Sequence, residues 1–198
     1  MCKAGSVPHA GLQRYSTIPQ ALVSAIPDSL ELREASTLPL SVTLAAVGLY
    51  QRNHLNLHLP RTPSEHEEEE HTKTTILIID GASEIGALAI QLATASGARV
   101  VATATSNPDA TFVQSLGASL VVVDDQEDPS TARAALAAAA LGAGGAEQLS
   151  GIFDTRSTDQ SFAQVDALLQ DLSQNPRVCA VKPPAYSPRS FVPTVGES

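Results

Sequence analysis

Two glycines and a serine stand at the spacing of a phosphate-binding turn, directly after a run of β-branched residues. The run TTILIID, residues 74–80, leads into GASEIG, which fits the pattern G-x-S-x-x-G through Gly81, Ser83 and Gly86. In the full dinucleotide fingerprint the first glycine makes a tight turn, the second admits a pyrophosphate and the third packs the helix on the strand. Gly81 and Gly86 suit the first and third positions, and the Ser83 hydroxyl could donate a hydrogen bond to a phosphate. The candidate cofactor-binding residues of this turn are Gly81, Ala82, Ser83, Glu84, Ile85 and Gly86.

Charges around this turn argue both for and against a bound anion. Backbone N–H groups of residues 84–86 would face an anion at the start of the next helix, where the helix dipole favours negative charge. Asp80 and Glu84 flank the turn and would repel a pyrophosphate unless their side chains point into solvent. The alternative is a purely structural turn between a strand and a helix, in a sheet that binds nothing.

The end of the next β-branched run indicates which nicotinamide cofactor the turn would hold. NAD-binding folds place a carboxylate about 20 residues after the turn, where it binds the ribose hydroxyls. Here residues 103–107 read TATSN, with no acid before Asp109 and no Arg or Lys. Because hydroxyls and an amide can bond a 2′-phosphate without charge repulsion, NADPH is favoured, with Thr103, Ser106 and Asn107 around the adenosine ribose. An ordinary polar loop is the alternative.

Short β-branched runs alternate with Ala/Leu-rich runs from residue 74 to about residue 181, and this alternation must position the candidate residues. The strand runs are almost continuously Val, Ile or Leu, as in sheets covered on both faces. Strands that alternate with helices of this length predict an α/β fold, a Rossmann-type doubly wound parallel sheet with right-handed crossovers. The expected strands are residues 74–80, 98–104, 119–124, 151–154 and 177–181, and the expected helices are residues 85–96, 108–116, 128–140 and 159–172. Asp128 and Gly142 are the expected caps of the third of these helices.

Three other segments set the expected domain limits. Residues 38–50, LPLSVTLAAVGLY, predict a buried helix entered after Pro39. The insert 61–73 carries closely spaced glutamates, which repel one another and stay hydrated. The proline-rich tail 182–198 is expected to be irregular. Residues 35–181 are therefore expected to form the cofactor-binding domain, interrupted by the acidic insert.

Composition excludes several classes of protein. The 198 residues are 43% hydrophobic and 4% aromatic, with a formal net charge of −9. An aliphatic core is therefore possible, whereas the absence of a basic stripe and of an aromatic platform argues against nucleic acid as a partner. No apolar run reaches the ~20 residues that a bilayer span needs, and the first residues lack a signal-peptide pattern. With two cysteines and no CxxC pair, we expect a cytoplasmic protein without a membrane partner.

The histidines and cysteines do not predict a metal site. His54 and His58 are four residues apart, and His66 and His71 bracket the glutamates. Structural zinc needs three or four preformed N or S ligands, so a solvated loop or weak adventitious binding is the simpler interpretation. Cys179 lies in the expected fifth strand, where it would be a small core residue.

Polar residues also follow the expected fourth strand, as Asp154, Thr155 and Arg156. This is the carboxyl edge at which open α/β sheets bind ligands, so the three residues could border a nicotinamide pocket. A plain strand-to-helix loop is the alternative. No Ser-His-Asp, GxSxG or P-loop pattern supports a hydrolase or an NTPase.

With these residues in view, the sequence resembles the medium-chain dehydrogenase/reductase superfamily, in the branch of quinone oxidoreductases, zinc-type alcohol dehydrogenase-like proteins and trans-acting enoyl reductases of polyketide pathways. Similar stretches follow the family's order over most of residues 11–181. They are AIPDSLELREASTLPL (25–40), AAVGLYQ (45–51), ILIIDGASEIGALAIQLA (76–93), ARVVATATS (98–106), VQSLGASLVVVD (113–124) and FDTRSTDQSF (153–162). The resemblance implies a Rossmann domain, NADPH as hydride donor and reduction of an activated C=C or C=O bond in a small-molecule substrate.

The resemblance also implies what the chain lacks. Family members carry an N-terminal GroES-like catalytic domain, and here only a remnant of it is expected in residues 1–34, where GLQRYSTIP (11–19) is similar to the segment that returns from that barrel. The barrel's catalytic residues would then be absent, so none is assigned. A threonine that members often place after LPL is offset, with Thr43 adjacent and Leu44 at the ungapped position, and the basic residue often found near Asn107 is missing.

Three functions remain open from the sequence. The first is an NADPH-dependent enoyl or quinone reductase, in which hydride goes to the β-carbon of an enone and a proton to the α-carbon. The second is a catalytically inactive Rossmann fragment that acts as a binding or assembly module. The third is a chain that completes its groove with another copy or a partner subunit, consistent with an exposed apolar face on residues 38–50.

Overall fold

The computed structural model describes residues 14–60, 74–124, 129–141, 149–172 and 175–181. These residues fall into two compact units, one ending at Leu38 and one beginning at Pro39. The candidate site lies entirely within the second unit.

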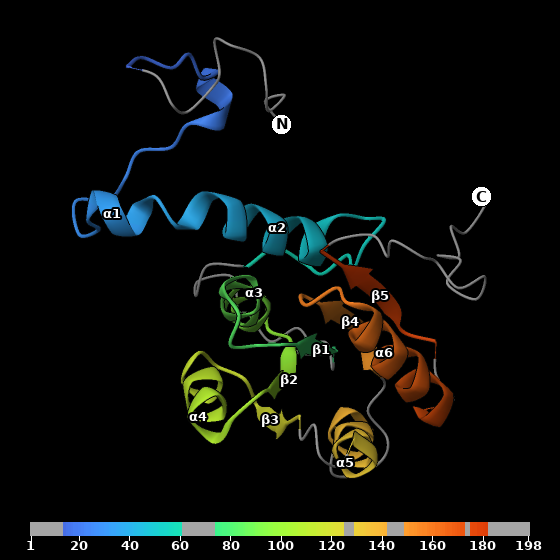
Figure 1. Cartoon of the computed structure of the whole chain (residues 1–198). Coiled ribbons are helices and arrows are strands. Elements are labelled where there is room, and N and C mark those ends of the chain that lie inside the picture. The colour runs from blue at the N-terminus through green and yellow to red at the C-terminus, as the bar shows by residue number, and fades with distance from the viewer. Residues whose placement is uncertain (1–13, 61–73, 125–128, 142–148, 173–174, 182–198) are drawn as a thin grey trace, which may run out of the picture. The chain divides into compact units, whose positions relative to one another are not determined.

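The second unit is built on a five-stranded sheet whose neighbouring strands are all parallel, in the order β3-β2-β1-β4-β5 (Figure 1). This is the Rossmann-type doubly wound order, so the predicted fold class is confirmed. All five residues of β1 are buried, as expected where helices cover both faces of a sheet. The strands are β1 (Thr75–Ile79), β2 (Arg99–Ala104), β3 (Leu120–Val123), β4 (Leu149–Asp154) and β5 (Arg177–Ala180).

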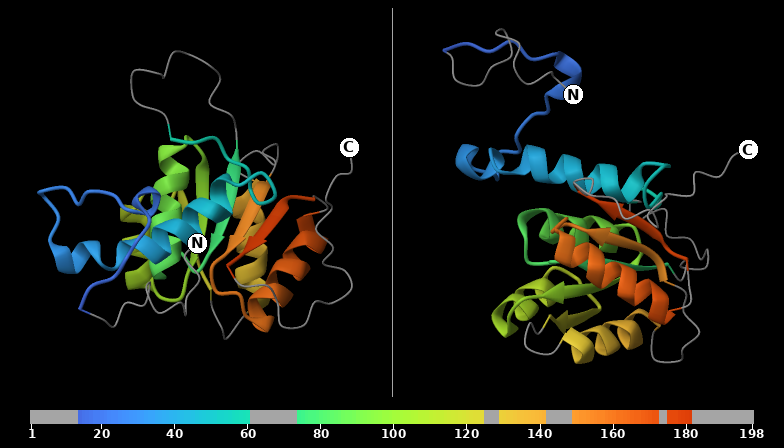
Figure 2. Two further views of the ribbon diagram at one scale, coloured as in Figure 1. Left: turned by 90° about the horizontal axis from the view of Figure 1, so that it is seen from above. Right: turned by 45° about the vertical axis from the view of Figure 1, so that its right-hand side comes forward.

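Helices form a layer on each side of this sheet (Figure 2). Alternate residues of β1 belong to two separate hydrophobic clusters, because successive side chains of a strand point to opposite faces. Ile76 and Ile78 pack with α2, α3 and α4, whereas Leu77 and Ile79 pack with α5 and α6. The helices are α2 (Leu38–Tyr50), α3 (Glu84–Ala95), α4 (Asn107–Ser115), α5 (Pro129–Leu141) and α6 (Asp159–Leu172).

The helix α2 corrects the prediction of a buried helix, since only one side of it is buried. Ala45 and Leu49 are fully buried, whereas the Leu40 side chain is 66% exposed. A Cβ on Gly48 would lie 2.6 Å from Cε2 of Phe153, so the glycine lets α2 approach the sheet closely. The apolar segment therefore supplies one layer of the core and also an exposed apolar position.

The strand and helix limits predicted from the sequence agree with the structure to within one residue, except at the start of β4. That strand begins at Leu149, two residues earlier than predicted. The pairing with β1 skips one residue, because Thr75 is opposite Leu149 and Ile76 is opposite Gly151. Such a bulge adds an unpaired residue at the start of the strand, which the search for continuous apolar runs did not predict. The predicted caps Asp128 and Gly142, the acidic insert and the proline-rich tail lie outside the described residues.

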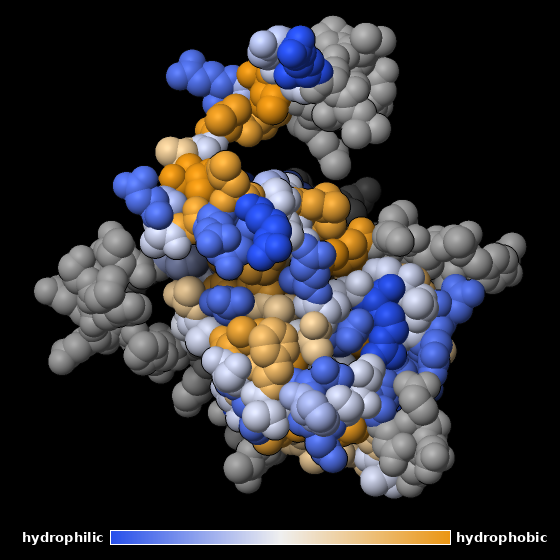
Figure 3. All heavy atoms as spheres, turned by 60° about the vertical axis from the view of Figure 1, so that its left-hand side comes forward, coloured by the Kyte–Doolittle hydropathy of each residue, from blue (hydrophilic) through white to orange (hydrophobic). Residues whose placement is uncertain are grey.

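The described residues of the first unit, 14–38, contain little regular structure. It holds the 3₁₀ helix η2 (Gln20–Leu22) and the one-turn helix α1 (Leu32–Ala35), and none of its described residues is buried. Large apolar side chains lie at its surface, among them Val23 at 59% and Leu32 at 76% exposure (Figure 3). In neither unit is any described helix both long and apolar enough to cross a bilayer.

Candidate functional site

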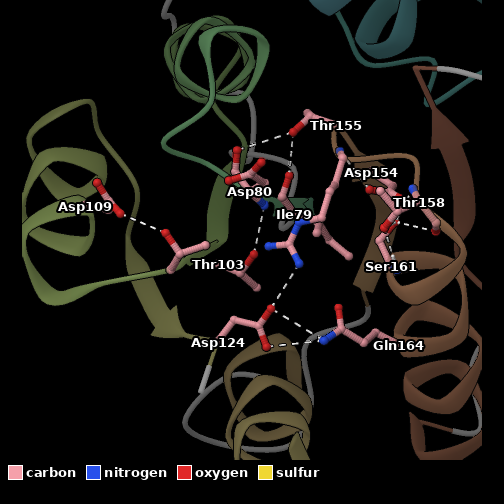
Figure 4. Close-up of polar contacts among 12 residues, drawn as sticks. Ile79, Asp80, Thr103, Asp109, Asp124, Asp154, Thr155, Thr158, Ser161 and Gln164 are labelled. Carbon is pink, nitrogen blue, oxygen red and sulfur yellow. Dashed lines mark hydrogen bonds and ion pairs between the residues drawn. The ribbon is translucent and has the colours of Figure 1, made fainter. Parts of the chain in front are cut away.

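The carboxyl ends of β1 and β4 meet at the topological switch point of the sheet. The chain continues from β1 through α3, which packs on one face, and from β4 through α6, which packs on the other. Ligands of open α/β sheets bind in the crevice outside such a point. Side chains from the ends of β1, β2, β3 and β4 converge there (Figure 4).

The first glycine of the candidate turn is fixed against β2. The Gly81 amide donates to the Thr103 carbonyl at 2.8 Å, and the Asp80 amide donates to the Thr103 hydroxyl at 2.8 Å. A Cβ on Gly81 would lie 3.0 Å from the Cδ1 atom of Ile90 and 3.1 Å from the Cβ atom of Ala102. Asp80 has a φ of 60°, a left-handed conformation that makes the sharp turn out of β1. A side chain at position 81 would therefore fit only if its neighbours moved by a few tenths of an ångström, so the packing of the turn favours glycine.

The last glycine of the turn lets α3 start directly on the strand. A Cβ on Gly86 would collide with the backbone carbonyl of Asp80 and would lie 2.9 Å from the Ser83 hydroxyl. This close approach is the role of the third glycine in the dinucleotide fingerprint. The structure thus places Gly81 and Gly86 in the two roles for which the sequence suited them.

The Ser83 hydroxyl is used within the fold rather than being free. Ser83 is the N-cap of α3: its hydroxyl accepts from the Gly86 amide at 3.1 Å and donates to the Asp80 carbonyl at 2.7 Å. It also lies 3.0 Å from the hydroxyl of Thr155, which donates to the Ile79 carbonyl at 2.7 Å. The Ser83 and Thr155 hydroxyls therefore connect the loops after β1 and β4 across the switch point.

Other amides of the turn remain available to an anion. In the described part of the chain, the amides of Ala82, Glu84 and Ile85 make no hydrogen bond. They stand at the start of a helix of 12 residues, where unpaired N–H groups and the helix dipole favour negative charge. The Glu84 side chain is exposed, so its carboxylate can stay hydrated.

The three candidate ribose residues differ in how accessible they are. Thr103 is 5% exposed, and its hydroxyl is used to hold the Asp80 amide. Ser106 caps α4, and its hydroxyl lies 2.6 Å from Oδ2 of Asp109. The hydrogen bonds from Ser106 and Thr105 lower the pKa of Asp109 below its ordinary value. Asn107 is exposed. The structure thus brings Ser106 and Asn107 to the surface after β2 and places Thr103 beneath it.

The loop after β4 is held together by Asp154. This carboxylate is fully buried and accepts from the amides of Arg156 and Ser157 at 3.0 and 3.1 Å. It also accepts from the Ser161 hydroxyl at 2.7 Å. For Asp154 these contacts favour the structural alternative, a strand-to-helix loop whose conformation the side chain fixes.

Asp124 is a residue of the site that the sequence did not single out. It follows β3, and its Oδ2 atom lies 3.3 Å from Nη1 of Arg156, in an ion pair whose side chains are 9% and 17% exposed. The Gln164 amide nitrogen lies 3.3 Å from the other carboxylate oxygen. A signal existed, because Asp80 and Asp124 directly follow strands and Asp154 is the last residue of one, and the carboxyl ends of parallel strands share one edge.

A cavity of about 330 Å³ lies between α5, α6 and the sheet. Its lining is mostly apolar, with Ile79 and Val122 from the strands and Leu136 and Leu168 from the helices. Thr103, Asp124 and Gln164 supply its polar wall. Small ligands commonly bind in such mostly apolar spaces with a few polar groups, and this one borders the residues of the crevice.

Cys179 and His54 lie together at β5, the edge strand of the sheet. Cys179 of β5 is buried, with its sulfur 3.5 Å from Nδ1 of His54, and burial raises the pKa of its thiol to about 11. A thiol with so high a pKa is a poor nucleophile at neutral pH. No group of three or more His, Cys, Asp or Glu side chains that could hold a metal occurs among the described residues. His66 and His71 lie outside them.

The fold and the glycine turn define a Rossmann-type α/β domain with the geometry of a dinucleotide-binding crevice. No protein-family model matches the chain. The trans-enoyl reductase himH of Aspergillus japonicus is 47% identical over 115 residues, which are 58% of this chain and 31% of that protein. The chain thus spans about a third of this relative.

Two solved structures extend the comparison. A putative zinc-dependent alcohol dehydrogenase protein from Rhizobium etli CFN 42 has a TM-score of 0.57 and 27% identity, covering 81% of this chain and 41% of that one. The Escherichia coli quinone oxidoreductase complexed with NADPH shares the fold, with a TM-score of 0.51 and 18% identity, covering 72% and 37%. In the part that these relatives match, the chain is similar to proteins of the medium-chain dehydrogenase/reductase superfamily, and the resemblance found in the sequence is confirmed.

Proposed function

We propose that this chain is the cofactor-binding part of an NADPH-dependent oxidoreductase that reduces an activated C=C or C=O bond in a small-molecule substrate. The observation that carries the proposal is the strand, turn and helix at the switch point. There Gly81 and Gly86 bring the start of α3 against β1, and the amides of Ala82, Glu84 and Ile85 make no hydrogen bond to another described residue. The NADPH named with the quinone oxidoreductase structure and the reaction named with himH support the same choice.

The residues of the crevice fit a dinucleotide phosphate. The unpaired amides can hold a pyrophosphate at the start of α3, and the exposed Asn107 after β2 can bond the adenosine ribose. When bound, NADPH supplies the hydride for the β-carbon of an enone. The residues of this chain bind and orient the cofactor, and the buried loop around Asp154 keeps the β4 side of the crevice in one conformation.

A titration of the purified chain with NADPH and NADH, followed by nicotinamide fluorescence, tests this proposal. We expect saturable binding with a lower Kd for NADPH. Replacing Glu84 with Lys removes a repulsive charge beside the unpaired amides, so the variant should bind both cofactors roughly 3- to 10-fold more tightly. The matched control is Glu34→Lys, the same charge change at an exposed residue of α1 in the other unit. No saturable binding of either cofactor up to millimolar concentration would reject the proposal.

One observation favours a second function, a binding or assembly module without catalysis. The Ser83 hydroxyl and the Gly86 amide, both near the expected position of the pyrophosphate, are already bonded to each other. A partner subunit or a second copy is part of this second proposal, and the exposed Leu40 of α2 is available to it. Size-exclusion chromatography with light scattering tests the second copy: a dimer that binds no nucleotide would favour the assembly module, and a monomer would exclude self-association of the purified chain.

A further inference from the structure

The side chain of Arg156 lies across the carboxyl ends of two strands. Arg156 follows β4 and Asp124 follows β3, yet Nη1 of the arginine lies 3.3 Å from Oδ2 of the aspartate. In the sheet order β3-β2-β1-β4, two strands lie between them. Three strand spacings of about 4.8 Å separate β3 from β4 by roughly 14 Å, which an extended arginine paired with an aspartate can span. The guanidinium therefore lies over the ends of β1 and β2, in the crevice itself.

The outer end of this side chain reaches the β2 side of the crevice. The Asp124 amide donates to the carbonyl of Ala104, the last residue of β2, at 2.7 Å. The carboxylate that holds Arg156 is thus tied to the strand after which Ser106 and Asn107 stand. In dinucleotide-binding folds the end of the second strand faces the 2′ position of the adenosine ribose.

One nitrogen of the guanidinium has no hydrogen-bond partner among the residues that the structure describes. The Nη2 atom of Arg156 is buried and makes no hydrogen bond to any described residue, while Nη1 is held by Asp124. A buried N–H group without an acceptor is unfavourable, so such groups are rare unless a ligand satisfies them. Gln164, bonded to the same carboxylate, helps to keep Asp124 in place. The arrangement presents an oriented cation with a donor left over.

We infer that Arg156 recognises the 2′-phosphate of NADPH, and that it supplies the positive charge that the segment after β2 lacks. This inference rests on the proposed function, because it assigns a specificity residue to the same crevice. Residues 103–107 contain no cation, and Asp109 adds a negative charge close to Ser106. Arginine suits this role, because its planar fork can bond one oxygen acceptor through Nη1 and another through Nη2.

The experiment compares Kd values for NADPH and NADH, and for 2′,5′-ADP and 5′-AMP, by fluorescence and calorimetric titration of the full chain. The second pair isolates the adenosine end of the cofactor. Arg156→Gln should raise the Kd for NADPH and for 2′,5′-ADP by roughly 10- to 100-fold. The Kd values for NADH and 5′-AMP should stay within about twofold of those of the unmodified chain. Arg33→Gln, the same charge change on α1 in the other unit, is the control.

The outcomes separate this inference from the proposed function. If the unmodified chain prefers NADPH and Arg156→Gln leaves the ratio of the Kd values for NADPH and NADH unchanged, Arg156 is not the specificity residue. The proposed function then still stands. If the unmodified chain binds neither cofactor, both fail. Thermal unfolding checks that each variant is folded. Should Arg156→Gln not fold, Arg156→Lys keeps the charge without the fork, and an unchanged NADPH:NADH ratio for that variant would overturn the inference.

Discussion

Ser83 shows how a single residue of the crevice serves the fold and opposes a ligand at the same time. Its hydroxyl caps α3 and contacts the Thr155 hydroxyl across the switch point. From the sequence, this hydroxyl could donate to a phosphate; in the structure it donates to the Asp80 carbonyl. The side chain thus occupies the place where the second glycine of the fingerprint would leave room for a pyrophosphate.

Replacement of Ser83 by Gly should therefore improve nucleotide binding at a small cost in stability. Exchange of a capping serine for Gly costs a few tenths of a kcal/mol, whereas Ser83→Ala should cost about 1 kcal/mol. The released Gly86 amide and the lost side chain should lower the Kd for NADPH by roughly 3- to 10-fold in Ser83→Gly. Urea unfolding and nicotinamide fluorescence measure the two effects. Unchanged or weaker NADPH binding in a folded Ser83→Gly variant would mean that the serine does not obstruct the site.

Cys179 should be almost inert while the protein is folded. Burial raises the pKa of its thiol from the ordinary 9.0 to about 11, so its thiolate is scarce near pH 8. In a Cys2→Ser variant, iodoacetamide should label the native chain about 100-fold more slowly than the urea-unfolded chain. Because the pKa of the thiol is higher in the folded state, its contribution to the free energy of unfolding is fully present below pH 9. That contribution is lost as the pH rises through about 11. Equal labelling rates in the native and unfolded chains would contradict the burial of Cys179.

At the scale of elements, the sequence pattern was sufficient to predict the strands but not to predict which side of α2 packs on the sheet. Runs of Val, Ile and Leu predicted the strands because both faces of the sheet are covered, and only the bulge at the start of β4 was missed. The segment that forms α2 has almost no polar side, so its sequence could not show which side is buried. The glycine turn was found because its spacing is local. The Asp124–Arg156 pair is 32 residues apart in sequence and depends on strand order, which no local pattern reports.

The packing of α2 on the sheet depends on the absence of a side chain at Gly48. In Gly48→Ala the added methyl would lie 2.6 Å from the ring of Phe153, which is itself buried. Helix propensity alone would favour alanine by about 1 kcal/mol, but overpacking of this kind usually costs 1–3 kcal/mol, so we expect a net loss of about 1 kcal/mol. The exposed control Thr43→Ala should be neutral or slightly stabilising. Urea unfolding checks both, and a more stable Gly48→Ala variant would show that Phe153 can move aside.

At the scale of the whole molecule, the chain that must bind an anionic dinucleotide is itself strongly acidic. Its formal net charge is −9. Around the crevice Arg156 is paired with Asp124. Asp80 lies in the turn after β1, and Glu84 and Asp109 lie in the first turns of α3 and α4. Local hydrogen-bond donors therefore favour cofactor binding, whereas long-range charge repulsion opposes it. The two effects can be separated, because salt screens the long-range repulsion more than it weakens short-range hydrogen bonds.

Salt should accelerate the association of NADPH with this chain, in contrast to proteins whose positive field attracts nucleotides. At about 0.01 M ionic strength charges interact over roughly 30 Å, whereas at 0.15 M the range falls to roughly 8 Å, so the repulsion between two anionic partners is largely removed. We expect the association rate constant to rise roughly 2- to 5-fold over this range, and to rise less for NADH, which carries one phosphate fewer. Stopped-flow nicotinamide fluorescence measures both rates. An association rate that falls with salt would show that the approaching cofactor meets a positive potential at the crevice, and that the donors of α3 and Arg156 outweigh the acidic surface.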